Sequence, residues 1–433
     1  MDQTSFNAGL MDFITGAPTP FHATDALTHT LRQAGFERLE ESAEWTLRAG
    51  GRYVVTRNGS SLIAFSLGTR DPADHGIRMV GAHTDSPCLK LKPHPEITAQ
   101  GYQQLTAEVY GGVLLNPWFD RDLSLAGRVT LATPDGALCN RLVDFRSPIA
   151  VIPSLAIHLD REANDKRSIN RQTHLPALVR GKSSDAFDLR EELTTLLVRA
   201  EPALAGARVQ AFELCFYDVQ PPSLVGWREE FIASARLDNL LSCYTGMCAL
   251  RDADADVAQL LVCNDHEEVG SGSTSGARGN FLESVLQRLL PAHESRARTL
   301  ARSLLVSTDN AHAVHPNFAD RHDPKHGPVI NEGPALKTNA NQSYATNSES
   351  AAVFRLAAEQ AGVPLQAFVA RADMGCGSTI GPLAATRLGV RTVDVGVPTF
   401  AMHSIRELAG TVDAYALYRA LQAFFAMPRV VVD

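Results

Sequence analysis

The sequence predicts an α/β fold: a mixed sheet flanked by helices, interrupted by an inserted domain that is mainly β. Two observations lead to this prediction. Apolar runs of strand length alternate with helix-period segments in residues 1–91 and again in 234–433, which is typical of helices that cover a largely parallel sheet. Between these segments, residues 92–233 change to strand-length runs separated by turn residues. We therefore expect one discontinuous α/β domain, 1–91 with 234–433, and one inserted β-rich domain, 92–233.

The elements of the discontinuous domain follow from the spacing of its apolar residues. Intervals of three and four predict helices over 6–14 and 22–34. Strands are expected at 53–56 and 62–67, joined by a hairpin turn at Asn58 and Gly59. A helix is expected to begin near Asp238, and helices also separate most of the remaining predicted strands, which lie at 77–82, 257–263, 303–307, 365–369 and 390–395. Within the insertion we expect strands at 105–110, 125–132, 137–145 and 208–219, and a helix at 190–200.

Composition excludes several classes of protein. The chain has 433 residues, a net charge of −8 and a pI near 6.0, which argue against nucleic acid or an anionic membrane as a partner. No apolar run approaches the roughly 20 residues that span a bilayer, and the N-terminus lacks the order of a signal peptide. Seven cysteines without a Cys-x-x-Cys pair indicate reduced thiols and a cytoplasmic location.

Two adjacent carboxylates, Glu267 and Glu268, follow the apolar run 257–263. Because neighbouring residues on a regular strand face opposite ways, both acids can reach one site only where the strand has ended. One carboxylate could then bind a metal while the other moves protons for the activated water. Other candidate metal ligands lie near the ends of neighbouring predicted strands or open a helix: His83 with its neighbour Asp85, Asp238, Asp309 and His403.

Each candidate alone has an ordinary interpretation, such as a solvated acidic turn, a hydrogen-bonded histidine or a helix N-cap. Together they are stronger, because strand ends at one edge of a sheet can converge on a single crevice. Two histidines with several carboxylates and no cysteine suit zinc, cobalt or manganese used for hydrolysis. That number of acids also allows two metals that share a bridging carboxylate.

Other chemistries fit the sequence less well. The glycine-rich stretch 270–276 lacks the spacing of a dinucleotide-binding loop, and it follows two acids that would repel phosphate. The chain contains neither a Gly-x-Ser-x-Gly turn nor a Gly-Lys-Ser/Thr phosphate loop. His266 and Glu267 lack the second histidine of a His-Glu-x-x-His helix.

Five longer motifs resemble the M18, or aspartyl aminopeptidase, family of metallopeptidases. They occupy residues 81–88, 118–128, 265–271, 309–317 and 402–407, and the similarity extends from Ala17 to the last predicted helix. The resemblance implies a zinc-peptidase-type mixed sheet and a di-zinc enzyme that removes one N-terminal residue from peptides. It also implies a role for each candidate: Asp238 bridges two zinc ions, Glu268 and His403 complete one zinc site, His83 and Asp309 complete the other, Glu267 is the general base, and Asp85 orients His83.

The resemblance further implies that His312, Lys337 and Tyr344 contact the substrate and that Asp or Glu is preferred. A lysine facing an acidic side chain in a closed pocket would form a charge-assisted hydrogen bond, and the alternative is a solvated surface lysine. The segment 373–377 reads Asp-Met-Gly-Cys-Gly where the family's animal enzymes have Asp-Ser-Pro-Cys-Gly, which leaves a preference for neutral residues open. A di-metal deacylase of N-acyl amino acids and a non-catalytic assembly protein are the rival classes.

The resemblance also concerns assembly. It implies that the inserted domain forms dimers, that the dimers build a tetrahedral dodecamer, and that His158 reaches the substrate site of a neighbouring subunit. From the residues alone, a histidine satisfied within its own β domain is the alternative.

Overall fold

The computed structural model describes residues 1–182, 187–254 and 256–432, and the chain forms two compact units. Unit 1 comprises Met1–Ser86, Pro222–Met402 and Glu407–Asp433; unit 2 comprises Pro87–Pro221 and His403–Arg406. Unit 2 thus begins five residues before the expected limit of 92 and ends before 233, because β11 pairs with β12 and β12 pairs with β20 of unit 1.

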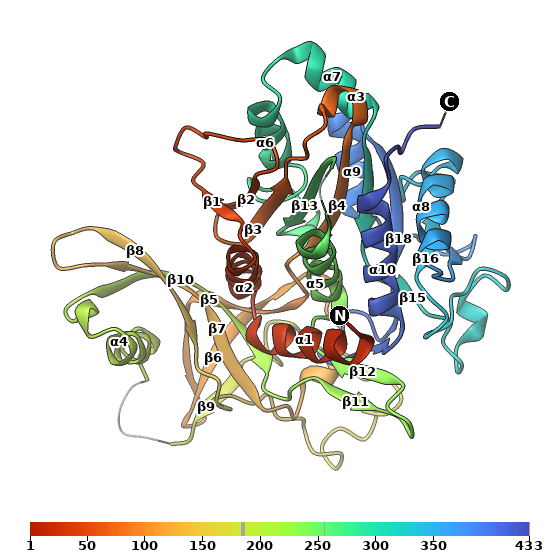
Figure 1. Cartoon of the computed structure of the whole chain (residues 1–433). Helices are drawn as coiled ribbons and strands as arrows, with labels where there is room; N and C mark the ends of the chain where they lie inside the picture. Colours follow the sequence, from red (N-terminus) through yellow and green to blue (C-terminus); the bar gives the residue numbers. More distant parts are fainter. Residues whose placement is uncertain (183–186, 255, 433) are drawn as a thin grey trace. The chain divides into compact units, whose positions relative to one another are not determined.

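Unit 1 is built on a nine-stranded mixed sheet of order β1-β2-β3-β13-β4-β14-β18-β16-β17 (Figure 1). Its four central strands, β13, β4, β14 and β18, are parallel, and every residue of β13 and β4 is buried. These strands span Ala258–Asn264, Ile77–His83, Leu304–Thr308 and Arg391–Gly396, each within one residue of its predicted limits. Their apolar sequences reflect burial on both faces, as expected for the middle of a parallel sheet.

The outer strands of this sheet are short. They are β1 (Glu37–Leu39), β2 (Arg52–Arg57), β3 (Ser61–Ser66), β16 (Ala335–Thr338) and β17 (Gln366–Val369). The expected hairpin joins β2 and β3, and Asn58 and Gly59 both adopt positive φ in its turn. A second, five-stranded sheet of unit 1 contains β11 (Ser223–Val225), β12 (Phe231–Ser234), β20 (Glu407–Gly410), β19 (Pro398–Phe400) and β15 (Ala311–His312).

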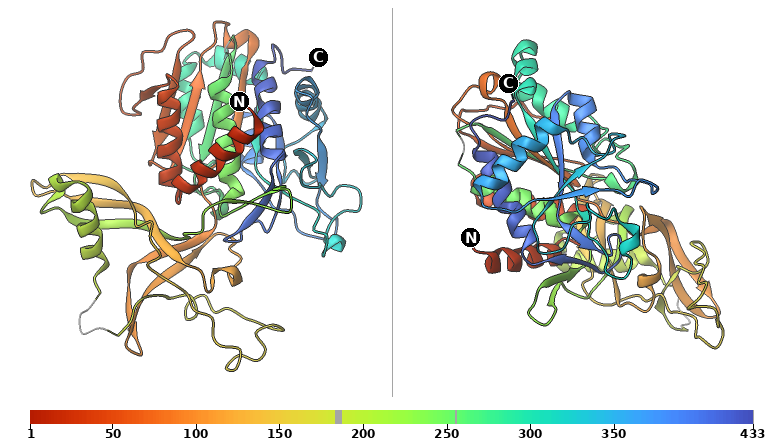
Figure 2. Two further views of the ribbon diagram at one scale, coloured as in Figure 1. Left: turned by 60° about the horizontal axis from the view of Figure 1, so that its bottom comes forward. Right: turned by 90° about the vertical axis from the view of Figure 1, so that its right-hand side faces the viewer.

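Helices cover both faces of the nine-stranded sheet, as Figures 1 and 2 show. One apolar core joins the sheet to α1 (Gln3–Gly16), α2 (Pro20–Gln33), α5 (Leu237–Asp252), α8 (Ser348–Gln360) and α10 (Asp413–Ala426). A second core joins it to α6 (Phe281–Leu289) and α9 (Ile380–Leu388), while α3 (Pro72–His75) contacts α7 (His293–Ala301). Helix α5 is buried from Leu237 to Leu250 and packs against β4, β13, α1 and α10, which explains why its sequence lacks a polar face.

Unit 2 contains a six-stranded antiparallel sheet of order β8-β7-β10-β5-β6-β9, with its own apolar core. Its elements are β5 (Cys88–Ala99), β6 (Tyr102–Tyr110), η1 (Asn116–Trp118), β7 (Leu123–Ala132), β8 (Leu138–Asp144), β9 (Ala177–Arg180), α4 (Leu189–Ala200), η2 (Pro202–Leu204) and β10 (Arg208–Asp218). The sequence did not predict β5, since Pro93 and Pro95 interrupt its alternation; the pairing of β5 with β6 shifts register between Leu91 and Glu96.

Candidate metal centre

Side chains of types that can bind a metal come from three different elements and meet at the carboxyl ends of the central strands. His83 ends β4, Asp238 lies in the first turn of α5, and Glu268 lies in η3 (Glu267–Val269) just after β13. One ligand atom from each of these residues lies within 4.8 Å of the other two. The His83 Nε2 atom also lies 3.7 Å from a carboxylate oxygen of Asp309, which follows β14. Four of the five predicted ligands therefore gather at one edge of unit 1.

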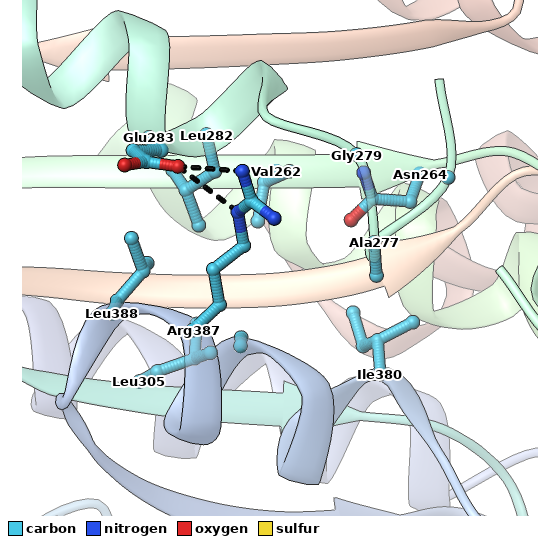
Figure 3. A pocket seen from close by; sticks show the side chains of 12 residues that line it. Val262, Asn264, Ala277, Gly279, Leu282, Glu283, Leu305, Ile380, Arg387 and Leu388 are labelled. Atoms are coloured by element: carbon cyan, nitrogen blue, oxygen red, sulfur yellow. Dashed lines mark hydrogen bonds and ion pairs between the residues drawn. The ribbon is translucent and has the colours of Figure 1, made fainter. Parts of the chain in front are cut away.

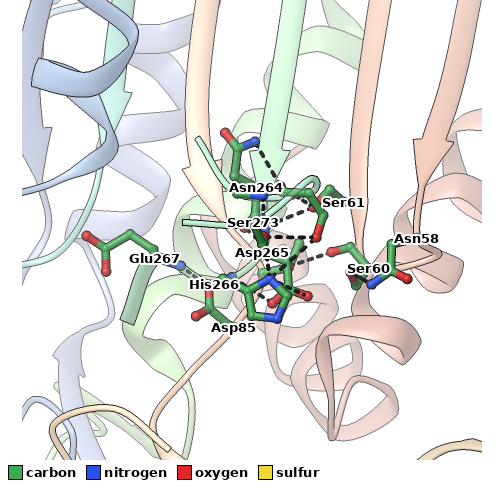
Figure 4. Close-up of polar contacts among 12 residues, drawn as sticks. Asn58, Ser60, Ser61, Asp85, Asn264, Asp265, His266, Glu267 and Ser273 are labelled. Atoms are coloured by element: carbon green, nitrogen blue, oxygen red, sulfur yellow. Dashed lines mark hydrogen bonds and ion pairs between the residues drawn. The ribbon is translucent and has the colours of Figure 1, made fainter. Parts of the chain in front are cut away.

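Asp85 links this cluster to the adjacent turn. Its Oδ1 lies 3.3 Å from His83 Nδ1, and the Asp85 backbone oxygen lies 3.0 Å from the same nitrogen. A proton on Nδ1 leaves the lone pair of Nε2 facing Asp238 and Asp309. The two carboxylate oxygens of Asp85 also accept the backbone N–H groups of Glu267 and Glu268, each at 3.1 Å. Figure 4 shows Asp85 beside Glu267. Asp85 thus fixes the imidazole and the Glu267–Glu268 turn together.

The electrostatics of the cluster favour a cation. Burial raises the pKa of Glu267 to about 8; the positive charge of His83 opposes this rise, and the charges of Asp309 and Glu268 add to it. Burial disfavours protonation of His83, yet hydrogen bonds to Asp238, Asp309 and Asp85 hold its pKa well above the ordinary value. Several buried acids thus face one imidazole, and a divalent cation would satisfy this donor set and keep Glu267 ionised near neutral pH.

Three supports of the cluster did not stand out in the sequence. Glu407 accepts the backbone N–H of Asp238 at 2.9 Å, and the Ser86 hydroxyl donates to the Asp238 carbonyl oxygen at 2.6 Å. The Asn239 side chain donates to the carbonyl oxygen of Thr308, at the end of β14. A buried acid or amide at such positions has no characteristic sequence pattern, since only tertiary contacts give it a partner.

His266 belongs to a further supporting group. Its Nδ1 lies 2.9 Å from the Ser273 hydroxyl, and its backbone oxygen accepts the N–H of Ser271 at 2.7 Å (Figure 4). Asp265 Oδ2 lies 3.5 Å from the same Nδ1 atom, and Asp265 Oδ1 accepts the N–H of His266. Burial raises the pKa of Asp265 to about 6. These contacts fold the glycine-rich stretch back onto the turn that carries Glu267.

Lys337 is buried rather than solvated, so the surface alternative raised by the sequence is wrong. Its ammonium donates to the backbone oxygens of Asp309 and Asn310, both at 3.0 Å, and lies 3.5 Å from a carboxylate oxygen of Asp309. It also lies 4.9 Å from the centre of the Tyr344 ring. His312 is exposed, and its ring contacts Phe368. All three expected substrate contacts of unit 1 therefore lie beside the Asp309 segment.

The remaining two predicted residues belong to unit 2. His403 Nδ1 donates to the carbonyl oxygen of Gly112 at 3.1 Å, which leaves Nε2 as the nitrogen able to bind a metal. His158 is exposed in a segment whose apolar residues Leu155, Ile157 and Leu159 are also exposed. The alternative of a histidine satisfied within its own β domain thus has no burial to support it.

Figure 3 shows a small cavity between strand β13 of the nine-stranded sheet and the helices α6 and α9. Its volume is about 20 Å³, and the Arg387 guanidinium pairs with Glu283 at 2.7 Å beside it. That volume suffices for one water molecule and not for a peptide, so this cavity is structural.

No helix in the described part of the chain is long and apolar enough to cross a membrane.

The chain is similar to known aminopeptidases in both sequence and structure. Residues 13–425 match the family model described as aminopeptidase I zinc metalloprotease (M18). The chain is 58% identical over 421 residues to a probable M18 family aminopeptidase 2 of Stutzerimonas stutzeri, covering 97% of this chain and 98% of that protein. A cryo-EM structure of the Ape4 and Nbr1 complex contains a chain that is 38% identical, with a TM-score of 0.93 and coverage of 98% and 86%. The Saccharomyces cerevisiae mApe1 dodecamer is 29% identical, with a TM-score of 0.82 and coverage of 98% and 97%.

Proposed function

The chain belongs to the M18 family of zinc metalloaminopeptidases, and we propose that it uses two zinc ions to remove single N-terminal residues, with a preference for Asp and Glu. The observation that carries the proposal is the convergence of His83, Asp238 and Glu268 within 4.8 Å, next to the partly buried carboxyl of Glu267. This arrangement separates metal-binding groups from one carboxyl that has no ligand role.

Under this proposal the zinc ligands are the five residues that the family pattern assigns. Asp238 would be shared by both ions, with Glu268 and His403 on one side and His83 and Asp309 on the other. The hydrogen bonds to His83 Nδ1 and His403 Nδ1 support these roles, because each occupies Nδ1 and leaves Nε2 as the nitrogen that a metal would bind. Bound zinc would lower the pKa of a water molecule and polarise the scissile carbonyl.

Glu267 would be the general base. Its carboxylate accepts a proton from the attacking water and passes that proton to the amine that leaves. The Asp85 carboxylate accepts the Glu267 backbone N–H at 3.1 Å. Asp85 would therefore position both the general base and His83. The group of carboxylates in the cluster offers a binding place for the free α-amine of a peptide, which accounts for cleavage at the chain end.

Preference for an acidic residue would depend on Lys337 with His312 and Tyr344. The Lys337 ammonium donates to two carbonyl oxygens and lies 3.5 Å from the Asp309 carboxylate, so a substrate carboxylate would compete with Asp309 for the third N–H. Lys337→Met should lower kcat/KM for N-terminal Asp and Glu about 10- to 150-fold and leave N-terminal Leu and Ala much less affected. A uniform loss on all four substrates would instead assign Lys337 to holding the Asp309 segment and remove the acidic preference.

Assembly is the second part of the proposal. We propose that unit 2 forms dimers, that these dimers build a dodecamer of tetrahedral symmetry, and that His158 reaches a neighbouring active site. The exposed leucine and isoleucine side chains on either side of His158 support this role, since contiguous apolar surface is typical of interfaces. A dodecamer of a 29% identical relative is consistent with it.

A panel of substrates tests the function. The purified protein should hydrolyse Asp, Glu, Leu and Ala amides with free α-amines, and a chelator should abolish the activity until zinc is restored. Cobalt or manganese can be compared in the same assay. Cleavage of N-acetylated amino acids with no action on free amines would instead make the protein a deacylase.

A further inference from the structure

A cavity of about 320 Å³ lies in unit 1 beside the Asp309 segment. Its lining includes three imidazoles, two guanidinium groups and one hydroxyl among apolar walls, and the polar members are His312, His315, His322, Arg321, Arg371 and Thr399. No aspartate or glutamate is among the lining residues in the described part of the chain. The volume falls at the lower end of the range for small-molecule sites, so the cavity can hold one side chain or a short peptide end.

A continuous series of contacts connects this cavity to the candidate metal centre. Lys337 contacts Asp309 and lies over the Tyr344 ring. The centre of the Tyr344 ring lies 6.2 Å from that of Phe368, which in turn lies 5.9 Å from the ring of His312. Phe368 and His312 both line the cavity. The cavity wall therefore includes His312 and Phe368, which belong to the same series of side-chain contacts as Lys337 and Asp309.

Backbone contacts make two of the imidazoles hydrogen-bond donors. The N–H of His315 donates to His322 Nε2, and the N–H of Asn317 donates to His315 Nδ1, both at 3.2 Å. Each ring has thus used its lone pair, so its proton is on the other nitrogen: Nδ1 of His322 and Nε2 of His315. Burial also lowers the pKa of His322, which keeps this ring neutral. Rings in these tautomers donate hydrogen bonds but bind no metal.

Arg371 adds a charged donor whose present partner is exchangeable. Its guanidinium donates to both carboxylate oxygens of Asp373, at 2.8 and 3.0 Å, and to the backbone oxygen of Asp320. The Asp373 side chain is 64% exposed, so solvent screens this ion pair and little free energy is lost when it opens. A carboxylate brought by the substrate can take the place of Asp373.

We propose that this cavity binds a carboxylate of the peptide substrate, held by Arg371 and by the N–H groups of His315 and His322. The apolar walls formed by Phe368, Phe400 and Met374 would pack against the carbon chain that carries the carboxylate. Two parts of a peptide supply this chemistry: the side chain of an N-terminal Asp or Glu, and the C-terminal carboxylate of a dipeptide. The inference rests on the proposed peptidase function and adds a subsite to it.

Four dipeptides distinguish the two sources: Asp-Ala, Asn-Ala and their C-terminal amides. Wild type should hydrolyse at least one peptide that carries a carboxylate with a higher kcat/KM than the matched peptide in which an amide replaces that carboxylate. Arg371→Met should lower kcat/KM about tenfold or more for the peptides that carry the bound carboxylate, and less than twofold for Asn-Ala amide, which has neither carboxylate. Arg387→Met is the matched control, because the Arg387 side chain is as exposed as that of Arg371 and also pairs with an acid, Glu283. It should leave all four rates unchanged.

Asp373→Asn provides the opposite test. It removes the internal carboxylate that competes for Arg371, so it should raise kcat/KM for the same peptides that Arg371→Met impairs. If Arg371→Met lowers kcat/KM only for Asp-Ala and Asp-Ala amide, the subsite binds the N-terminal side chain. If it lowers kcat/KM only for Asp-Ala and Asn-Ala, the subsite binds the C-terminal carboxylate. Equal effects on all four peptides, or no preference in wild type for any carboxylate, would overturn the subsite. Chelator-sensitive hydrolysis of Asn-Ala amide by wild type reports separately on the peptidase function.

Discussion

At the scale of single residues, the candidate site places two adjacent glutamates in different environments. Glu268 belongs to the group of atoms that lie within 4.8 Å of one another, and Glu267 does not. The carboxylate of Asp85 accepts the backbone N–H of both residues and so fixes the turn that carries them. This geometry favours one ligand and one base.

Glu267→Gln should retain both metal ions and reduce kcat by several orders of magnitude, because it removes the base and no ligand. Glu268→Gln should lower the metal content itself. Metal analysis beside steady-state kinetics measures both effects on the same preparations. Equal loss of metal in the two variants would contradict the division of roles.

At the scale of elements, the end of β18 packs directly against the turn that follows β14. A Cβ atom at Gly396 would lie 2.1 Å from the Asp309 backbone oxygen and 2.8 Å from the Ala311 nitrogen. Both are backbone atoms, so the Asp309 turn would have to move to make room.

Gly396→Ala should therefore destabilise the fold by about 1–3 kcal/mol and weaken metal binding through Asp309. Gly272→Ala is the matched control, because its Cβ would meet nothing within 4 Å. Thermal melting and zinc titration of both variants provide the comparison. Unchanged zinc affinity in Gly396→Ala would show that the Asp309 turn adapts without cost.

The first turn of α10 contains a titrating group that links it to the loop before β16. Asp413 accepts the backbone N–H groups of Asn331 and Gly333 at 2.7 and 2.8 Å. Burial nevertheless raises its pKa from 3.8 to about 6, since the hydrogen bonds offset only part of the desolvation.

This shift predicts a pH dependence of stability. A carboxyl whose pKa is higher in the folded state stabilises the fold most below its unfolded pKa, and this contribution is lost as pH rises towards about 6. The melting temperature of wild type minus that of Asp413→Asn should thus fall between about pH 4 and 6 and level off above. Subtraction removes the titration of groups common to both proteins. A difference that is constant over this range would exclude the shift.

At the scale of the whole molecule, the residues around His158 bear on the proposed assembly. Leu155 and Leu159 are 59% and 74% exposed in unit 2, an unusual position for two leucines close together. If His158 serves a neighbouring subunit, each active site needs residues from two chains.

His158→Ala and Glu267→Gln proteins should each be nearly inactive alone. Dissociating, mixing and reassembling them should restore part of the activity, because one subunit supplies the intact base and its neighbour supplies the histidine. Mass spectrometry of the mixture confirms exchange of subunits. Activity equal to the sum of the two parents after confirmed exchange would place His158 outside the neighbour's site.

Much of the fold follows from local pattern. The strands 77–82, 257–263, 303–307 and 390–395 could be recognised because both faces of a parallel strand are buried and its sequence is apolar throughout. Strand β16 was missed, since only four residues, including the polar Lys337 and Thr338, form it. Strand β5 was missed because two prolines interrupt its alternation.

By itself, the sequence determined the order of the central strands along the chain, the residue types that follow their ends, and the family to which the motifs point. These properties depend on neighbours in the chain and on periodicity. Only the tertiary structure decided that Lys337 is buried against Asp309, that Asp85 holds both glutamates, and that segments near 315, 321 and 371 enclose a cavity. Contacts between residues distant in sequence create burial and hydrogen-bond partners, and no local pattern encodes which distant partner a side chain meets.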